Sequence, residues 1–190
     1  MSNHPSRAEA VEILRAAGCA PGVIRHCTSV ARIALGMAQK AKLGKNLDLN
    51  LIEIGALLHD LGRSQTATVR HGVLGADIAR KLDLDEVLVN IIAHHIGAGI
   101  PFEEAEGLGL PPQDYLPTTP EEKIVCYADK LTTGNRKMLY EEAKRQMVKE
   151  LGPTHPAIGR FEKLHKEILD LGIEDYGSCS LRKNSSEKTK

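Results

Sequence analysis

The chain has 190 residues, of which 42% are hydrophobic and 26% are charged, a composition typical of one soluble globular domain. Lys plus Arg and Asp plus Glu both number 25, so the zero net charge argues against a basic nucleic-acid-binding platform or a polybasic membrane anchor. The four cysteines form no C-x-x-C pair, the N-terminus has no apolar signal region, and no apolar run is long enough to span a bilayer. We therefore expect a cytoplasmic protein without a membrane segment.

Helical periodicity recurs along the chain and no segment shows the alternation typical of a strand, so the sequence predicts an all-α fold. Ser6 and Glu9 form a capping box before a first helix that stops near Gly18. A second helix begins around residues 21–22, carries one apolar stripe and is expected to end at Gly44.

The middle of the chain predicts three further helices. Residues 49–59 are apolar almost all round, which is typical of a central helix. Residues 62–70 are polar and predict a loop, and a helix is expected over 71–82. Asp83 is the predicted N-cap of the next helix, which runs to His95.

A Gly- and Pro-rich segment follows, over residues 97–120, with one short helix predicted at 102–106. A loop of that length in a compact domain is often functional, as a lid or substrate wall. Residues 119–122 read Thr-Pro-Glu-Glu, a capping box with Pro at the first helical position. Two amphipathic helices over 136–151 and 156–171 are expected to form an outer layer.

These elements suggest one domain. Its expected parts are an N-terminal helix (1–20), a central bundle (21–135), C-terminal helices of the same domain (136–175) and a disordered, polar C-terminal tail (176–190).

Residues that bind metals recur at helix ends and within apolar helices. His59 and Asp60 end an almost wholly apolar helix, and Asp129 lies in the segment IVCYADKL. A buried carboxylate needs a partner, and imidazole and carboxylate groups from several helices build metal sites in helical bundles. An isolated His-Asp pair would be explained better as a helix C-cap pair with solvated side chains. The other candidates, which change that balance, are His26, His71, His94 and His95.

The order His26, His59-Asp60, Asp129 resembles the HD superfamily of metal-dependent phosphohydrolases. The block HDLGR at 59–63 is similar to the HDIGK/R block of that family. The segments HGVLGADIAR at 71–80, HHIGAGIP at 94–101 and EEKIVCYADKL at 121–131 are similar to a family of small HD-domain proteins of archaea and some bacteria. The resemblance covers about residues 21–131. The GYP segment of HD-GYP proteins is missing, which argues against a dedicated cyclic-di-GMP enzyme.

The resemblance implies a compact, all-α HD-domain bundle that holds one or two divalent ions. The core ligands would be His26, His59, Asp60 and Asp129. The extra His71 and His95 resemble the ligands of the second ion in the dinuclear branch, where Asp60 would bridge both ions and accept a proton from a water between them. His94 is a possible further ligand. The metal would be manganese, iron, zinc, nickel, cobalt or magnesium.

Two cations flank the predicted ligands. Arg63 would bind phosphate oxygens in a forked contact, and Lys130 would act as a point charge. The alternative for both is an ordinary surface cation, and for Lys130 we favour that alternative.

The predicted function is hydrolysis of a phosphomonoester, phosphodiester or phosphoanhydride in a small phosphorylated compound, a nucleotide above all. An HD-fold di-iron oxygenase is the alternative, because the same ligand types suit iron. A non-catalytic signalling module is disfavoured, because every expected ligand position is filled. The sequence leaves the metal, the substrate and the oligomeric state open.

Overall fold

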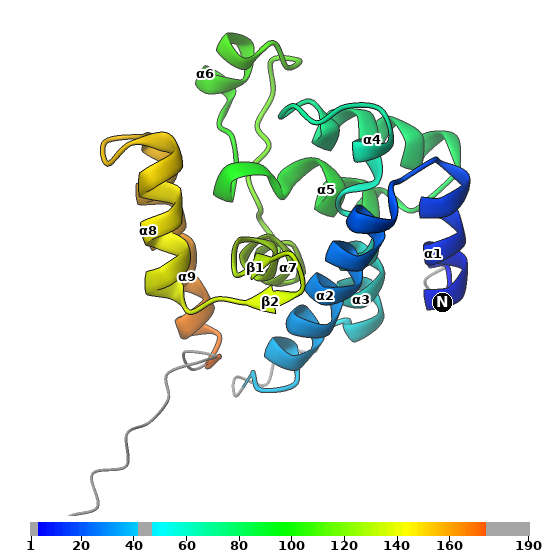
Figure 1. Ribbon diagram of the computed structural model, residues 1–190, viewed down its shortest axis with the longest axis horizontal. Helices are drawn as coiled ribbons and strands as arrows, with labels where there is room; N and C mark the ends of the chain where they lie inside the picture. The colour runs from blue at the N-terminus through cyan, green and yellow to red at the C-terminus, as the bar shows by residue number, and fades with distance from the viewer. Residues whose placement is uncertain (1–3, 42–46, 174–190) are drawn as a thin grey trace, which may run out of the picture.

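The computed structural model describes residues 4–41 and 47–173. Within these ranges the chain is helical, with one small hairpin, so the predicted all-α class is confirmed (Figure 1). The predicted disordered tail at 176–190 lies outside the described residues. The second helix, expected to end at Gly44, ends already at Ala38.

The elements follow one another along the chain, and the longest stretch between two of them covers residues 109–119. In chain order they are α1 (Arg7–Ala16), α2 (Pro21–Ala38), α3 (Leu49–Leu58), η1 (Leu61–Ser64), α4 (His71–Lys81), α5 (Glu86–His94), η2 (Ile96–Ala98), α6 (Phe102–Ala105), η3 (Glu106–Leu108), α7 (Pro120–Lys130), β1 (Thr132–Thr133), β2 (Arg136–Lys137), α8 (Tyr140–Leu151) and α9 (Pro156–Asp170). The η elements are 3₁₀ helices.

Side-chain caps fix where α1 and α3 begin. The hydroxyl of Ser6 accepts from the backbone N–H of Glu9, and the Glu9 carboxylate accepts from the N–H of Ser6, so the predicted capping box is confirmed. Asp48 caps α3 by accepting from the N–H of Leu51 at 2.9 Å.

Two helices form the centre of the molecule. The predicted central helix, α3, packs against α1, α2, α5 and α7, and its Ile52, Leu57 and Leu58 are fully buried. Helix α7, seen end-on in the middle of Figure 1, packs against α2, α3, α5 and α9. Polar residues at the C-terminal ends of α3 and α7 are therefore held inside the bundle.

Further details of the prediction are wrong. Asp83 does not cap α5: its φ of 53° places it in the left-handed turn that closes α4, where the N–H of Leu84 donates to the carbonyl of Ala79. The expected helix start near residue 136 is replaced by the antiparallel pair β1–β2, because Gly134, with φ of 57°, turns the chain back. Helix α8 therefore begins only at Tyr140.

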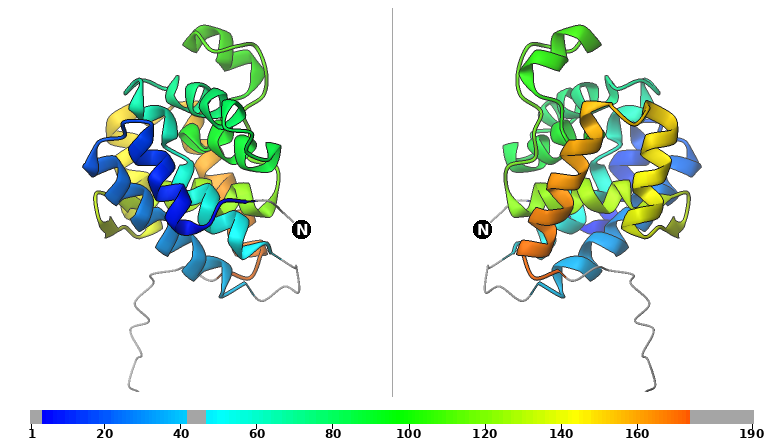
Figure 2. Two further views of the ribbon diagram at one scale, coloured as in Figure 1. Left: turned by 90° about the vertical axis from the view of Figure 1, so that its right-hand side faces the viewer. Right: turned by 90° about the vertical axis from the view of Figure 1, so that its left-hand side faces the viewer.

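The segment between η2 and α7 projects from the bundle at the end that carries α6 (Figure 2). Its two arms are joined by an antiparallel bridge between Ile100 and Tyr115. The predicted short helix is present as α6 and continues into η3. No helix in the described part of the chain combines the length and apolar character that crossing a membrane requires.

Candidate metal centre

The structure brings the six predicted ligands together from five helices. His26 lies in α2, His71 begins α4 and Asp129 lies near the end of α7, while His59 with Asp60, and His95, directly follow α3 and α5. Their ligand atoms form two groups, each within 4.8 Å: His26, His59 and Asp129; and Asp60, His71 and His95.

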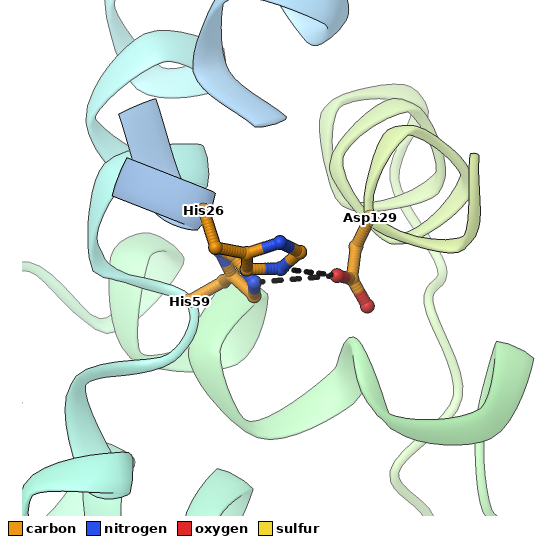
Figure 3. A group of neighbouring side chains, drawn as sticks. All are labelled: His26, His59 and Asp129. Carbon is orange, nitrogen blue, oxygen red and sulfur yellow. Dashed lines mark hydrogen bonds and ion pairs between the residues drawn. The ribbon is translucent and has the colours of Figure 1, made fainter. Parts of the chain in front are cut away.

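The first group is centred on one oxygen of Asp129. His26 Nε2 lies 2.9 Å and His59 Nε2 lies 3.5 Å from Asp129 Oδ1 (Figure 3). Both imidazoles and the carboxylate point toward one another across the gap between α2, α3 and α7. One cation placed between them would contact all three.

The second group is centred on one oxygen of Asp60. His71 Nε2 lies 3.1 Å and His95 Nε2 lies 3.6 Å from Asp60 Oδ1. The other oxygen of Asp60, Oδ2, lies 3.7 Å from His59 Nε2 and 3.9 Å from His26 Nε2. The carboxylate of Asp60 therefore stands between the two groups and turns one oxygen to each.

Backbone carbonyls orient three of the imidazoles. Nδ1 of His59, His71 and His95 donates to a carbonyl three residues earlier, at 2.7, 2.7 and 2.8 Å. For His59 and His95 these carbonyls belong to the last turns of α3 and α5, where carbonyls lack helical partners. A proton on Nδ1 leaves the lone pair of Nε2 facing the cluster, the arrangement that a metal-binding histidine needs.

The contact between His71 and His95 tests whether these residues fit a metal. Their Nε2 atoms lie only 3.0 Å apart, and both Nδ1 atoms are donors to carbonyls, so the contact needs either a proton or a cation between the two Nε2 atoms. A divalent ion can fill that place, since two nitrogens bound to one ion at about 2.1 Å are about 3.0 Å apart at a right angle and about 3.4 Å apart at the tetrahedral angle. The set of imidazoles and carboxylates fits a divalent ion.

Burial and charge act against each other in the cluster. Burial alone would raise the pKa of Asp60 and of Asp129. The neighbouring histidines outweigh burial at Asp60 and bring its pKa below the ordinary range. Lys130, together with His26 and His59, does the same for the pKa of Asp129. Burial lowers the pKa of His95 to about 4, so its Nε2 is free of a proton. For His59, burial is outweighed by the carboxylates, which raise its pKa. A metal ion competes with that proton for the same lone pair.

The two predicted cations lie beside the ligands. Arg63 donates from Nε to Asp60 Oδ1 at 3.1 Å and from Nη1 to the carbonyl of Ala67 at 3.0 Å. Lys130 forms an ion pair with Asp129, and only 20% of its side chain is exposed. The surface-cation reading that we favoured for Lys130 is therefore wrong.

His94 has a different partner from His95. Its Nδ1 donates to Glu122 Oε2 at 2.8 Å, and Glu122 also accepts from the backbone N–H and hydroxyl of Thr118. His94 belongs to neither ligand group. The residue that the sequence did not single out is Cys27, whose buried thiol lies within 4.8 Å of ligand atoms of His59 and Asp60.

A cavity of about 350 Å³, the metal cavity from here on, opens onto the cluster. Five of the six ligands, all except His59, line this cavity together with Arg63 and Lys130, and so do Met138 and residues of α8, among them Ala143 and Met147. Helix α8, expected only as an outer layer, therefore also forms a wall of the site.

Three comparisons place the chain among known proteins. Over 155 residues it is 47% identical to an uncharacterised protein of Methanocaldococcus jannaschii, an alignment that covers 80% of this chain and 91% of that one. Over 162 residues it is 40% identical to a tRNA (cytidine(56)-2'-O)-methyltransferase of Thermoplasma volcanium, with 85% of this chain but only 46% of that protein covered. The chain thus spans less than half of the methyltransferase.

A solved structure, the HD domain of the phosphodiesterase PgpH of Listeria monocytogenes in complex with cyclic-di-AMP, has the same fold. The TM-score is 0.50 at 16% identity, over 87% of this chain and 97% of that one. The family model for the HD domain matches residues 23–134, more than half of the chain. The chain therefore belongs to the HD-domain family of metal-dependent phosphohydrolases.

Proposed function

We propose that this protein hydrolyses a phosphoester or phosphoanhydride bond of a small, nucleotide-like compound at a centre of two divalent ions. The observation that carries the proposal is the position of Asp60. One oxygen faces His26 and His59, and the other faces His71 and His95. A carboxylate with one oxygen for each group is the ligand that two ions about 3.5–4 Å apart would share.

In this proposal His26, His59 and Asp129 would hold the first ion, His71 and His95 would hold the second, and Asp60 would be a ligand of both. When bound, the ions supply a water of lowered pKa and positive charge for the phosphoryl oxygens. The nitrogen-rich ligand set favours manganese, iron, zinc, nickel or cobalt over magnesium, which prefers oxygen ligands.

The chain itself positions the substrate and moves the proton. Asp60 accepts a proton from the attacking water, since its carboxylate lies between the two ligand groups. Arg63 and Lys130 line the metal cavity and bind phosphoryl oxygens. Two nitrogens of Arg63 are engaged, but its Nη2 has no hydrogen-bond partner among the described residues and is available to an anion.

A nucleotide is the proposed substrate class for two reasons. The volume of the metal cavity, about 350 Å³, is at the lower end of what small-molecule sites offer, which suits a compound of nucleotide size. The HD domain of PgpH, which shares the fold, was solved with the nucleotide cyclic-di-AMP.

The test combines metal analysis with a substrate screen. The protein is purified without added metal, its ions are counted, and phosphomonoesters, phosphodiesters and dinucleoside polyphosphates are assayed with each candidate ion. Asp60→Ala should abolish turnover, whereas Asp77→Ala, on the exposed face of α4, should not. Oxygen consumption by the iron-loaded protein without turnover of any phosphate compound would replace the proposal with the oxygenase. Neither metal nor turnover would leave a non-catalytic module.

A further inference from the structure

A hollow of about 300 Å³ lies between α2 and the turn of the β1–β2 hairpin, and we call it the arginine pocket. The hairpin lies beside α2 (Figure 1). Residues of α2 and one residue of the hairpin turn line the pocket: Ile24, Arg25, Thr28, Ser29, Arg32 and Asn135. None of them lines the metal cavity, so the two hollows are separate.

One face of α2 supplies most of the polar lining. The polar residues that it contributes are Arg25, Thr28, Ser29 and Arg32. Counted from Arg25, they follow at three-, four- and seven-residue steps, which bring side chains to the same face of a helix. Because long side chains lean toward the N-terminus of their helix, Arg32 lies over the turn that carries Thr28 and Ser29. Two guanidinium groups and two hydroxyls therefore share one face.

The positive charge of the arginine pocket is not neutralised. Arg63, for comparison, pairs with the carboxylate of Asp60. Arg25 and Arg32 are exposed and form no hydrogen bond or ion pair with any residue that the structure describes, and none of the residues that line the pocket is acidic. A guanidinium group without a carboxylate is a preformed, forked donor for an oxyanion.

A buried hydroxyl in the pocket also lacks a partner. Ser29 is only 9% exposed, and its Oγ makes no hydrogen bond within the described part of the chain. The hydroxyl of Thr28, next to it, donates to the carbonyl of Ile24 at 2.8 Å. A buried hydroxyl without a hydrogen bond is costly, so an acceptor bound in the pocket would stabilise it. The side-chain amide of Asn135 offers further donors from the hairpin.

We propose that the arginine pocket binds a phosphate group. The oxygens of the phosphate accept from Arg25, Arg32 and Ser29, and its negative charge offsets that of the two guanidinium groups. A carboxylate has two oxygens and one charge, whereas a phosphate group brings at least three acceptor oxygens and a charge of about −1.5 to −2 at neutral pH. The phosphate is either the free ion or the end group of a phosphorylated small compound. Because the pocket is separate from the metal centre, this binding goes beyond the proposed function.

The test uses the metal-free protein, in which no bound ion can hold phosphate. Inorganic phosphate and ribose 5-phosphate are titrated at constant ionic strength, and ¹H–¹⁵N NMR follows the amide signals. We expect saturable shifts at Ser29 and Asn135, including the side-chain amide of Asn135. Tighter binding of ribose 5-phosphate would identify a phosphorylated compound as the ligand, whereas equal affinities would identify the free ion.

Substitutions test which groups hold the phosphate. Arg32→Gln should weaken binding about tenfold or more, because a charge-assisted contact is lost. Ser29→Ala removes only the hydroxyl and should weaken binding about threefold. Arg145→Gln is the matched control, since Arg145 is an exposed arginine of α8 that lines neither the arginine pocket nor the metal cavity. It should leave the affinity unchanged.

The absence of saturable shifts at Ser29 and Asn135 with both probes would overturn the inference. Equal losses of affinity in Arg32→Gln and Arg145→Gln would also overturn it, because binding would then follow the overall charge alone. Shifts confined to Arg63 and Lys130 would place the phosphate in the metal cavity, which would overturn the arginine pocket but leave the proposed function intact.

Discussion

Arg63 is tied to the carboxylate of Asp60: its Nε donates to Oδ1 over 3.1 Å. The same oxygen faces His71 and His95, so the guanidinium helps to orient the carboxylate that separates the two ligand groups. Its Nη1 donates to the carbonyl of Ala67, which holds the guanidinium at the wall of the metal cavity. Arg63 is thus placed both to bind phosphate and to position Asp60.

The two roles of Arg63 can be separated by substitution. We expect Arg63→Ala to lower kcat/KM by about 10- to 100-fold, because a charge-assisted contact to the phosphate is lost. Arg63→Lys keeps the positive charge but cannot form the two parallel hydrogen bonds of a guanidinium. It should therefore recover only part of the lost kcat/KM. Steady-state kinetics with a phosphodiester are measured alongside metal content. If Arg63→Ala raises KM while its metal content at saturating ion stays at the wild-type level, Arg63 binds the phosphate. Wild-type kinetics in Arg63→Ala would show that Arg63 has no part in binding the substrate.

The second ion can be tested by counting. We expect about two ions per chain after reconstitution with manganese or iron, and about one in His71→Ala, because that group would lose one of its two imidazoles. The measurement is metal analysis after removal of free ions, with His155→Ala, a histidine outside both ligand groups, as the control. One ion per chain in both the wild type and His71→Ala would leave only a mononuclear centre.

The sequence allowed the helices and the candidate ligand residues to be predicted, because helical periodicity and polar residues at the ends of apolar helices are local patterns. His59 and His95 follow apolar helices, and there a polar side chain is unusual enough to be noticed. The wall contributed by α8 was not predictable, since Ala143 and Met147 look like any apolar stripe until the helix is docked. The positive φ of Asp83 and of Gly134 was not predictable either. Asp and Gly tolerate this backbone conformation, but the residue type alone does not require it.

The neighbouring histidines His94 and His95 should respond differently to removal. His94→Ala takes one donor from Glu122, which is only 5% exposed, and should destabilise the fold by about 1–2 kcal/mol while the metal content stays unchanged. His95→Ala should lower the metal content, because its Nε2 faces Asp60. Urea unfolding of the metal-free proteins and metal analysis together distinguish the two effects. Loss of an ion in His94→Ala would instead make His94 a ligand.

A close backbone contact holds His71 against the segment that follows Asp60. A Cβ at Gly62 would lie 2.0 Å from the carbonyl oxygen of His71 and 2.6 Å from the backbone nitrogen of Gly75, so neither neighbour could move aside cheaply. Glycine at position 62 thus allows η1 and α4 to approach each other, and this approach places Asp60 and His71 within reach of one ion.

Gly62→Ala should therefore destabilise the protein by about 3 kcal/mol and weaken binding at the second ion, because α4 must shift away from η1 and carry His71 with it. Gly107→Ala is the matched control: a Cβ there meets nothing within 4 Å, and the residue does not have a positive φ. Urea unfolding gives the stability and manganese titration gives the affinity of each ion. Equal stability and equal manganese binding in the two variants would show that the contact between η1 and α4 does not position His71.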